Sequence, residues 1–172
     1  MILFSRVFNL FLMIMMTLIT IMAIPFFISK ITNSPIYTHP AFVEYLSEFK
    51  KDADKYNVDV SYYKLVTVFS NGEQQGVAAF CLPSTKTVVI YSSVWKDLTR
   101  EGKKALLYHE WGHCLLRRDH VEDINYVQLC PHSLMYPYIE PLKTCYGKHQ
   151  ESYNRELFTN PFNFKTFSRS RK

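Results

Sequence analysis

Glycine is scarce in this sequence, with only 5 residues in 172, and no internal repeat is present. These absences exclude a collagen-like chain and a repeat array, which need periodic glycine or a recurring unit. The apolar share of 48% against 20% charged residues excludes an intrinsically disordered protein. We therefore expect one domain of ordinary size around a single core.

A basic stripe is also lacking. The formal net charge is +5, but Arg6, Lys30, Arg169, Arg171 and Lys172 lie near the two ends, so the middle of the chain is close to neutral. Nucleic-acid-binding surfaces cluster lysine and arginine on one face, often between aromatic side chains. We expect no nucleic-acid partner.

Charge is absent from residues 7–29, which are mostly Leu, Ile, Met and Phe. At about 1.5 Å per residue such a run spans roughly 34 Å, enough to cross a hydrocarbon core about 30 Å thick. The bulky Ile21 stands two positions before Ala23, so no small-x-small cleavage site is visible. We favour a membrane anchor in residues 1–30 over a cleaved signal segment. The flanking charges place the domain on the extracytoplasmic side, periplasmic or extracellular, or in the secreted fraction if the leader is cleaved.

The four cysteines, Cys81, Cys114, Cys130 and Cys145, all follow this segment. An even number in an exported domain predicts disulfide bonds, and the three pairings of a fully oxidised set remain open. No C-x-x-C spacing occurs, so a zinc site made of cysteines alone is not expected.

Local patterns divide the rest into a linker at residues 31–39, a domain at 40–158 and a basic, disordered tail at 159–172. Pro40 suits the first turn of a helix, and Thr99 suits an N-cap. The periodicities predict helices at 40–56, 94–98, 100–116 and 149–158, and strands at 60–69, 76–82 and 87–91. These elements predict an α+β fold with a small, twisted, mixed sheet.

The helix predicted at 100–116 carries the pattern H-E-x-x-H as His109-Glu110-Trp111-Gly112-His113. Four residues make about one helical turn, so His109 and His113 share a face and can bind one metal ion. Glu110 lies about 100° around the helix, where it can reach a metal-bound water without being a ligand. Imidazole ligands favour Zn²⁺, which takes three protein ligands at catalytic sites. A third ligand is therefore needed.

Downstream of this helix come Asp119-His120 and then Ser-Leu-Met-Tyr-Pro, which contains Met135. With the H-E-x-G-H string, these residues resemble the metzincin clan of zinc peptidases, and most closely its matrixin pattern H-E-x-G-H-x-x-G-x-x-H followed by a Met-turn. The resemblance spans residues 86–140 and implies a zincin-like fold. One residue is inserted before the third ligand, and Leu116 or Arg117 replaces the family's turning glycine.

Three alternatives remain for the third ligand. His120 is favoured by its chemistry and by the preceding aspartate, whereas spacing alone places Asp119 at the family position. A distant acid would instead imply a different zincin architecture, and the candidates are Glu140, Glu151 and Glu156.

The resemblance implies a zinc-dependent endopeptidase that acts on a peptide or protein substrate, with Glu110 as general base. It also implies that residues 76–82 form the edge strand that pairs with substrate, that Met135 lies beneath the metal, and that Tyr136 or Tyr138 can donate to an oxyanion. One alternative is a catalytically inactive, zinc-stabilised extracytoplasmic binding domain, against which an intact Glu110 argues. Another is a membrane-tethered interaction protein in which the histidines are incidental.

Overall fold

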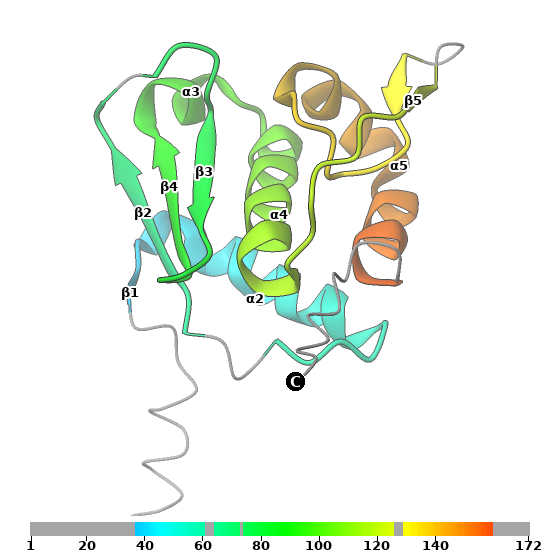
Figure 1. The fold of residues 1–172 in the computed structure, drawn as a ribbon, viewed down its shortest axis with the longest axis horizontal. Helices are drawn as coiled ribbons and strands as arrows, with labels where there is room; N and C mark the ends of the chain where they lie inside the picture. Colours follow the sequence, from blue (N-terminus) through cyan, green and yellow to red (C-terminus); the bar gives the residue numbers. More distant parts are fainter. Residues whose placement is uncertain (1–36, 61–63, 73, 126–128, 160–172) are drawn as a thin grey trace, which may run out of the picture. The chain divides into compact units, whose positions relative to one another are not determined.

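The computed structural model describes residues 37–60, 64–72, 74–125 and 129–159. They form an α+β domain around a mixed four-stranded sheet of order β1-β2-β4-β3 (Figure 1). The strands are β1 (Tyr37–Thr38), β2 (Val66–Ser70), β3 (Ala79–Leu82) and β4 (Thr87–Tyr91). The first three in this order run parallel, and β3 pairs antiparallel with β4 at the edge. The expected α+β class with a mixed sheet is confirmed.

In the part of the chain that the structure describes, four helices accompany the sheet, namely α2 (Pro40–Asp54), α3 (Ser92–Asp97), α4 (Arg100–Leu116) and α5 (Ile139–Thr159). Helix α4 stands between the sheet and α5, and α2 crosses below it in the view of Figure 1. Beyond α4, the strands β5 (Ile124–Asn125) and β6 (Cys130–Pro131) form a small antiparallel pair. The central position of α4 explains why most of its residues are buried.

Local sequence signals fix where the two main helices begin. Thr99 accepts a hydrogen bond from the backbone N–H of Gly102 at 3.2 Å, so it is the N-cap of α4 as predicted. Pro40 begins α2, where the missing proline N–H costs nothing because the first helical N–H groups have no partner in the helix. The predicted bounds of α4 and β4 agree with the structure.

Several elements differ from the expectation, among them the edge strand expected at 76–82, because β3 begins only at Ala79. Two residues assigned to the linker form β1 and pair with β2, and β2 begins at Val66 rather than at residue 60. Helix α5 begins at Ile139, ten residues earlier than predicted, and contains a kink at His149 with φ −126° and ψ 24°. Pro141 lies in the first turn of α5, where proline is tolerated.

The predicted membrane segment at 7–29 lies outside the described residues, and so do residues 160–172 of the predicted tail, whose first residue, Thr159, ends α5. Among the helices that the structure describes, none has both the length and the hydropathy needed to cross a bilayer.

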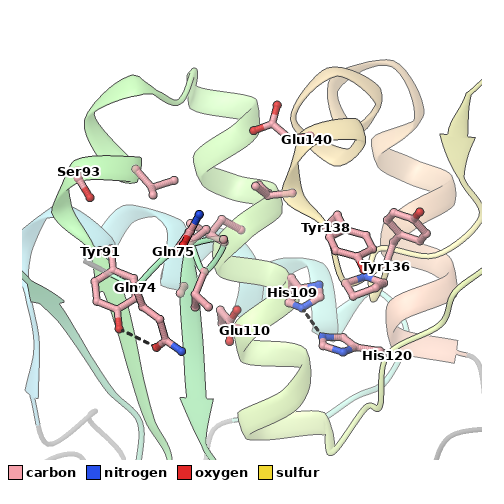
Figure 2. A pocket seen from close by; sticks show the side chains of 18 residues that line it. Gln74, Gln75, Tyr91, Ser93, His109, Glu110, His120, Tyr136, Tyr138 and Glu140 are labelled. Carbon is pink, nitrogen blue, oxygen red and sulfur yellow. Dashed lines mark hydrogen bonds between the residues drawn. The ribbon is translucent and has the colours of Figure 1, made fainter. Parts of the chain in front are cut away.

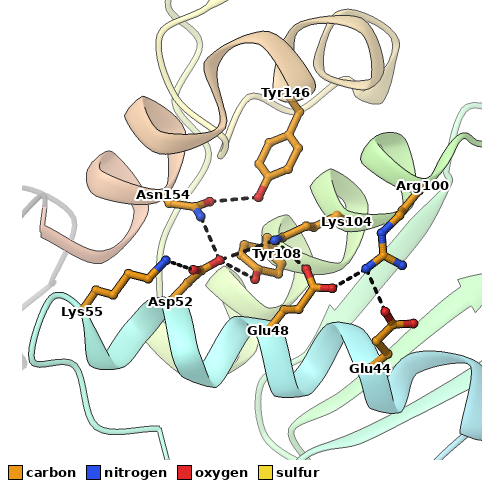
Figure 3. Close-up of polar contacts among 9 residues, drawn as sticks. All are labelled: Glu44, Glu48, Asp52, Lys55, Arg100, Lys104, Tyr108, Tyr146 and Asn154. Atoms are coloured by element: carbon orange, nitrogen blue, oxygen red, sulfur yellow. Dashed lines mark hydrogen bonds and ion pairs between the residues drawn. The ribbon is translucent and has the colours of Figure 1, made fainter.

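Buried charges join the helices α2, α4 and α5 (Figure 3). Asp52 of α2, only 6% exposed, accepts hydrogen bonds from the hydroxyl of Tyr108 at 2.9 Å and from the amide of Asn154 at 3.0 Å. Lys55 donates to its other carboxylate oxygen at 2.7 Å. Lys104 lies 3.5 Å from Asp52 and 2.7 Å from Glu48. Because each buried charge has an opposite partner, the network holds α2, α4 and α5 together.

The four cysteines form two disulfides, as their even number predicted. Cys81 of β3 is bonded to Cys114 of α4, and Cys130 of β6 to Cys145 of α5. The first bond ties the edge strand to the helix of the H-E-x-x-H motif, and the second ties β6 to α5. Two disulfides indicate an oxidising compartment.

Candidate metal centre

Three histidine side chains converge at the end of α4. His109 and His113 project from the helix, and the chain that leaves it brings back His120. The Nε2 atoms of His109 and His113 are 3.0 Å apart, and the Nε2 atom of His120 lies 3.2 Å from the first and 3.1 Å from the second. Within the described residues these histidines are the group that could hold a metal ion.

Two backbone carbonyls set the orientation of the helical histidines. The Nδ1 atom of His109 lies 2.9 Å from the carbonyl oxygen of Leu134, and the Nδ1 atom of His113 lies 2.6 Å from that of Arg118. A carbonyl only accepts, so each Nδ1 carries the proton. In a neutral imidazole the Nε2 atom then has a free lone pair, which is the form that binds a metal.

Burial keeps these imidazoles neutral. Burial and, to a lesser extent, the charge of the neighbouring His113 lower the pKa of His109 to about 3. The hydrogen bond to the Leu134 carbonyl raises the pKa, but by less. Burial also lowers the pKa of His113. Both imidazoles are therefore neutral at neutral pH, and their Nε2 atoms are available as ligands without a proton to displace.

The donor set fits a metal such as zinc. With Zn–N bonds of about 2.0–2.1 Å, tetrahedral geometry places ligand nitrogens roughly 3.3–3.4 Å apart. The observed separations of 3.0, 3.2 and 3.1 Å are close to this range. Two Nε2 lone pairs cannot hydrogen-bond to each other, and they repel when they face one another. A cation or a proton shared between them would remove this repulsion.

Glu110 lies beside the histidines as a buried carboxyl group. It is 5% exposed, and its Oε2 atom has no hydrogen-bond partner among the described residues. Burial raises the pKa of Glu110 to about 8. An unpaired buried carboxyl group is costly, and such groups are commonest where chemistry requires them.

A pocket of about 900 Å³ opens in front of Glu110, His109 and His120 (Figure 2). One side is formed by residues 74–79, which lead into the edge strand β3, and the opposite side by residues 136–140, which follow Met135. Tyr136 and Tyr138 both line the pocket, and Tyr138 is the more exposed. The histidine cluster is thus accessible to a ligand larger than water.

Met135 is fully buried beneath α4 and does not belong to the metal-binding group. A Cβ atom built on Gly112 would lie only 2.7 Å from the Met135 sulfur. Gly112 is therefore required for the close approach of the helix to the turn that carries Met135.

The remaining candidate ligands lie outside the histidine group. Asp119 is exposed. Glu140 forms an ion pair with Lys143, and Glu151 forms one with Arg155. Glu156 binds Arg118 and Ser133 instead. Of the three alternatives for the third ligand, the geometry supports His120.

The carbonyl groups of Leu134 and Arg118 were not found by sequence reasoning. A backbone oxygen carries no residue signature, and the two loops are brought to α4 only by tertiary packing. The glutamines Gln74 and Gln75, which line the pocket, were also missed because they precede β3 in a segment with no motif.

Comparisons with models of protein families, with curated proteins and with solved structures gave no significant match to this chain. The resemblance to metzincins therefore rests on the motif residues alone.

Proposed function

We propose that this protein is a zinc-dependent endopeptidase of metzincin type. The observation that supports it best is the convergence of His109, His113 and His120 beside the unpaired carboxyl group of Glu110, at the wall of an open pocket. A purely structural metal site has no need of a buried carboxyl group or of an accessible face.

The three histidines would hold the ion through Nε2. When bound, zinc would supply Lewis acidity toward a carbonyl oxygen and would lower the pKa of a coordinated water. Glu110 would take a proton at Oε2 and return it to the leaving nitrogen, which makes it the general base and then the general acid. The carbonyls of Leu134 and Arg118 keep two of the imidazoles in the required tautomer.

A peptide substrate is favoured by the position of β3. This strand has one paired side, toward β4, and lies at the edge of the sheet. The segment that leads into it lines the pocket, so an extended peptide could pair with its free main-chain groups while its scissile bond faces Glu110. The phenols of Tyr136 and Tyr138 are the candidates for an oxyanion donor.

We further propose an extracytoplasmic location. The two disulfides support an oxidising compartment, and the uncharged run at residues 7–29 supports a membrane anchor or an export signal.

Two measurements test the proposal. Metal analysis of the full chain, purified without chelator, should find about one zinc ion per chain, as expected for a three-histidine site. Replacement His120→Ala should abolish binding, whereas Asp119→Ala should retain it. A wild-type protein without metal would refute the site, and the opposite result for the two variants would make Asp119 the ligand.

Catalysis is tested by Glu110→Gln in a peptidase assay. The variant should keep its zinc, and its rate of peptide hydrolysis should fall by about 10²–10⁴-fold, the usual contribution of a general base. Zinc-loaded wild-type protein that cleaves no peptide in a broad substrate library would support the inactive binding domain instead.

A further inference from the structure

We propose that Glu156 of α5 is a positioning residue for the metal centre and holds in place the two loops that orient its ligands. This inference rests on the proposed metal site. Glu156 lies on α5, far along the chain from the motif, and it is one of the acids that the sequence suggested as a distant ligand.

The two carboxylate oxygens of Glu156 bind different loops. Its Oε1 atom forms an ion pair with Nη2 of Arg118, in the segment that leaves α4. Its Oε2 atom accepts a hydrogen bond of 2.8 Å from the hydroxyl of Ser133, in the segment before Met135. One side chain thus connects the segment that leaves α4 to the segment that precedes Met135.

Each of these loops holds one histidine through its backbone. The carbonyl of Arg118 accepts from Nδ1 of His113, and the carbonyl of Leu134, adjacent to Ser133, accepts from Nδ1 of His109. His120 follows Arg118 by two residues, so the same anchored loop also carries the third imidazole. All three candidate ligands therefore depend on segments that Glu156 fixes.

Further contacts make the connection rigid. The guanidinium of Arg118, which is 2% exposed as a residue, also donates to the backbone carbonyls of Glu156 at 3.0 Å and Leu157 at 2.7 Å. The Ser133 hydroxyl accepts from the backbone N–H of Met135 at 3.0 Å. A buried, charge-assisted network of this kind has one preferred geometry, which is what a preorganised metal site requires.

The chain offers a matched control on the same helix. Glu151 is exposed and pairs only with Arg155 in the contacts that the described residues show. Glu151→Gln removes the same charge from α5 without touching either loop. Glu156→Gln keeps the size of the side chain but weakens both links, and Ser133→Ala removes one link while it leaves the pair with Arg118 intact.

The test measures metal dissociation constants of the full chain for Zn²⁺ and Co²⁺ by chelator competition, together with the visible spectrum of the Co²⁺ form and the unfolding free energy of the metal-free protein. Partners that orient metal ligands typically contribute about 10–100-fold in affinity. We expect Glu156→Gln and Ser133→Ala each to weaken metal binding by about 10-fold and to alter the Co²⁺ spectrum, and Glu151→Gln to change neither.

Two results would overturn the inference, and they have different meanings. If the Glu156→Gln and Ser133→Ala variants bind both metals as Glu151→Gln does, and only their stability falls, Glu156 supports the fold but does not position the ligands. If wild-type protein binds neither metal, the proposed function fails and this inference fails with it. Should Glu156→Gln not fold, Ser133→Ala decides the outcome, because it keeps the charge pair of the buried Arg118.

Discussion

Substitution of Gly112 by alanine tests how closely α4 must approach the Met135 turn. A Cβ atom at this position would lie 2.7 Å from the sulfur of Met135 and 3.1 Å from Cδ1 of Leu157. Both neighbours are buried, at 0% and 1% exposure. Since carbon and sulfur atoms do not approach within 3.0 Å without repulsion, the turn or the helix has to shift.

The expected magnitude combines two opposing effects. Overpacking a buried site costs about 1–3 kcal/mol, whereas alanine is about 1 kcal/mol better than glycine inside a helix. We therefore expect the free energy of unfolding to fall by up to about 2 kcal/mol. The shift should also weaken metal binding, because Leu134, adjacent to Met135, supplies the carbonyl that orients His109.

Gly102→Ala is the matched control in the same helix. Its added Cβ would meet side-chain atoms of Leu98 and Lys143 at 3.3 Å, which small adjustments can relieve. We expect this variant to stay within about 1 kcal/mol of wild type and to bind metal normally. Urea unfolding in the presence of a chelator measures stability, and chelator competition measures metal affinity. The reasoning is refuted if Gly112→Ala is as stable as Gly102→Ala and binds metal equally well.

Two other predictions concern the disulfides and the buried charge network. Replacing Cys81 and Cys114 together by serine opens a loop of 33 residues and should lower the free energy of unfolding by about 4 kcal/mol. The same replacement of Cys130 and Cys145, whose loop spans 15 residues, should lower it by about 3 kcal/mol. Urea unfolding measures both losses, and no loss in either variant would contradict the loop-entropy argument. For Asp52, burial acts to raise the pKa, but hydrogen bonds from Lys55 and Tyr108 and the charge of Lys104 outweigh it, so the folded-state pKa is lowered. The stabilisation from this carboxylate is then present above the unfolded-state pKa, near 3.9, and is lost as the pH falls through the folded-state value. Asp52→Asn should lower the free energy of unfolding at pH 7 by about 2 kcal/mol. Its stability should also fall less than that of wild type as the pH is lowered. Parallel pH profiles of stability for wild type and the variant would contradict a stabilising role of the Asp52 carboxylate.

Local signals in the sequence determined the motif helix. Thr99 capped it, and the 3.6-residue period placed His109 and His113 on one face, so the start of α4 and the pairing of the two imidazoles followed from neighbours in the chain. The β-branched run at 87–91 likewise gave β4 its bounds. These features depend on contacts within a few residues.

The contacts between segments distant in the sequence could not be read from local patterns and became known only from the tertiary structure. The choice among His120, Asp119 and the distant acids depends on the path of the loop after α4, which Arg117 turns with φ 55° in place of glycine. The cysteine pairing, the start of α5 and the role of Glu156 depend in the same way on which segments pack against α4. Sequence patterns record the periodicity and capping of one element, whereas the position of one loop relative to another is set by packing and buried hydrogen bonds that form only when the whole core assembles.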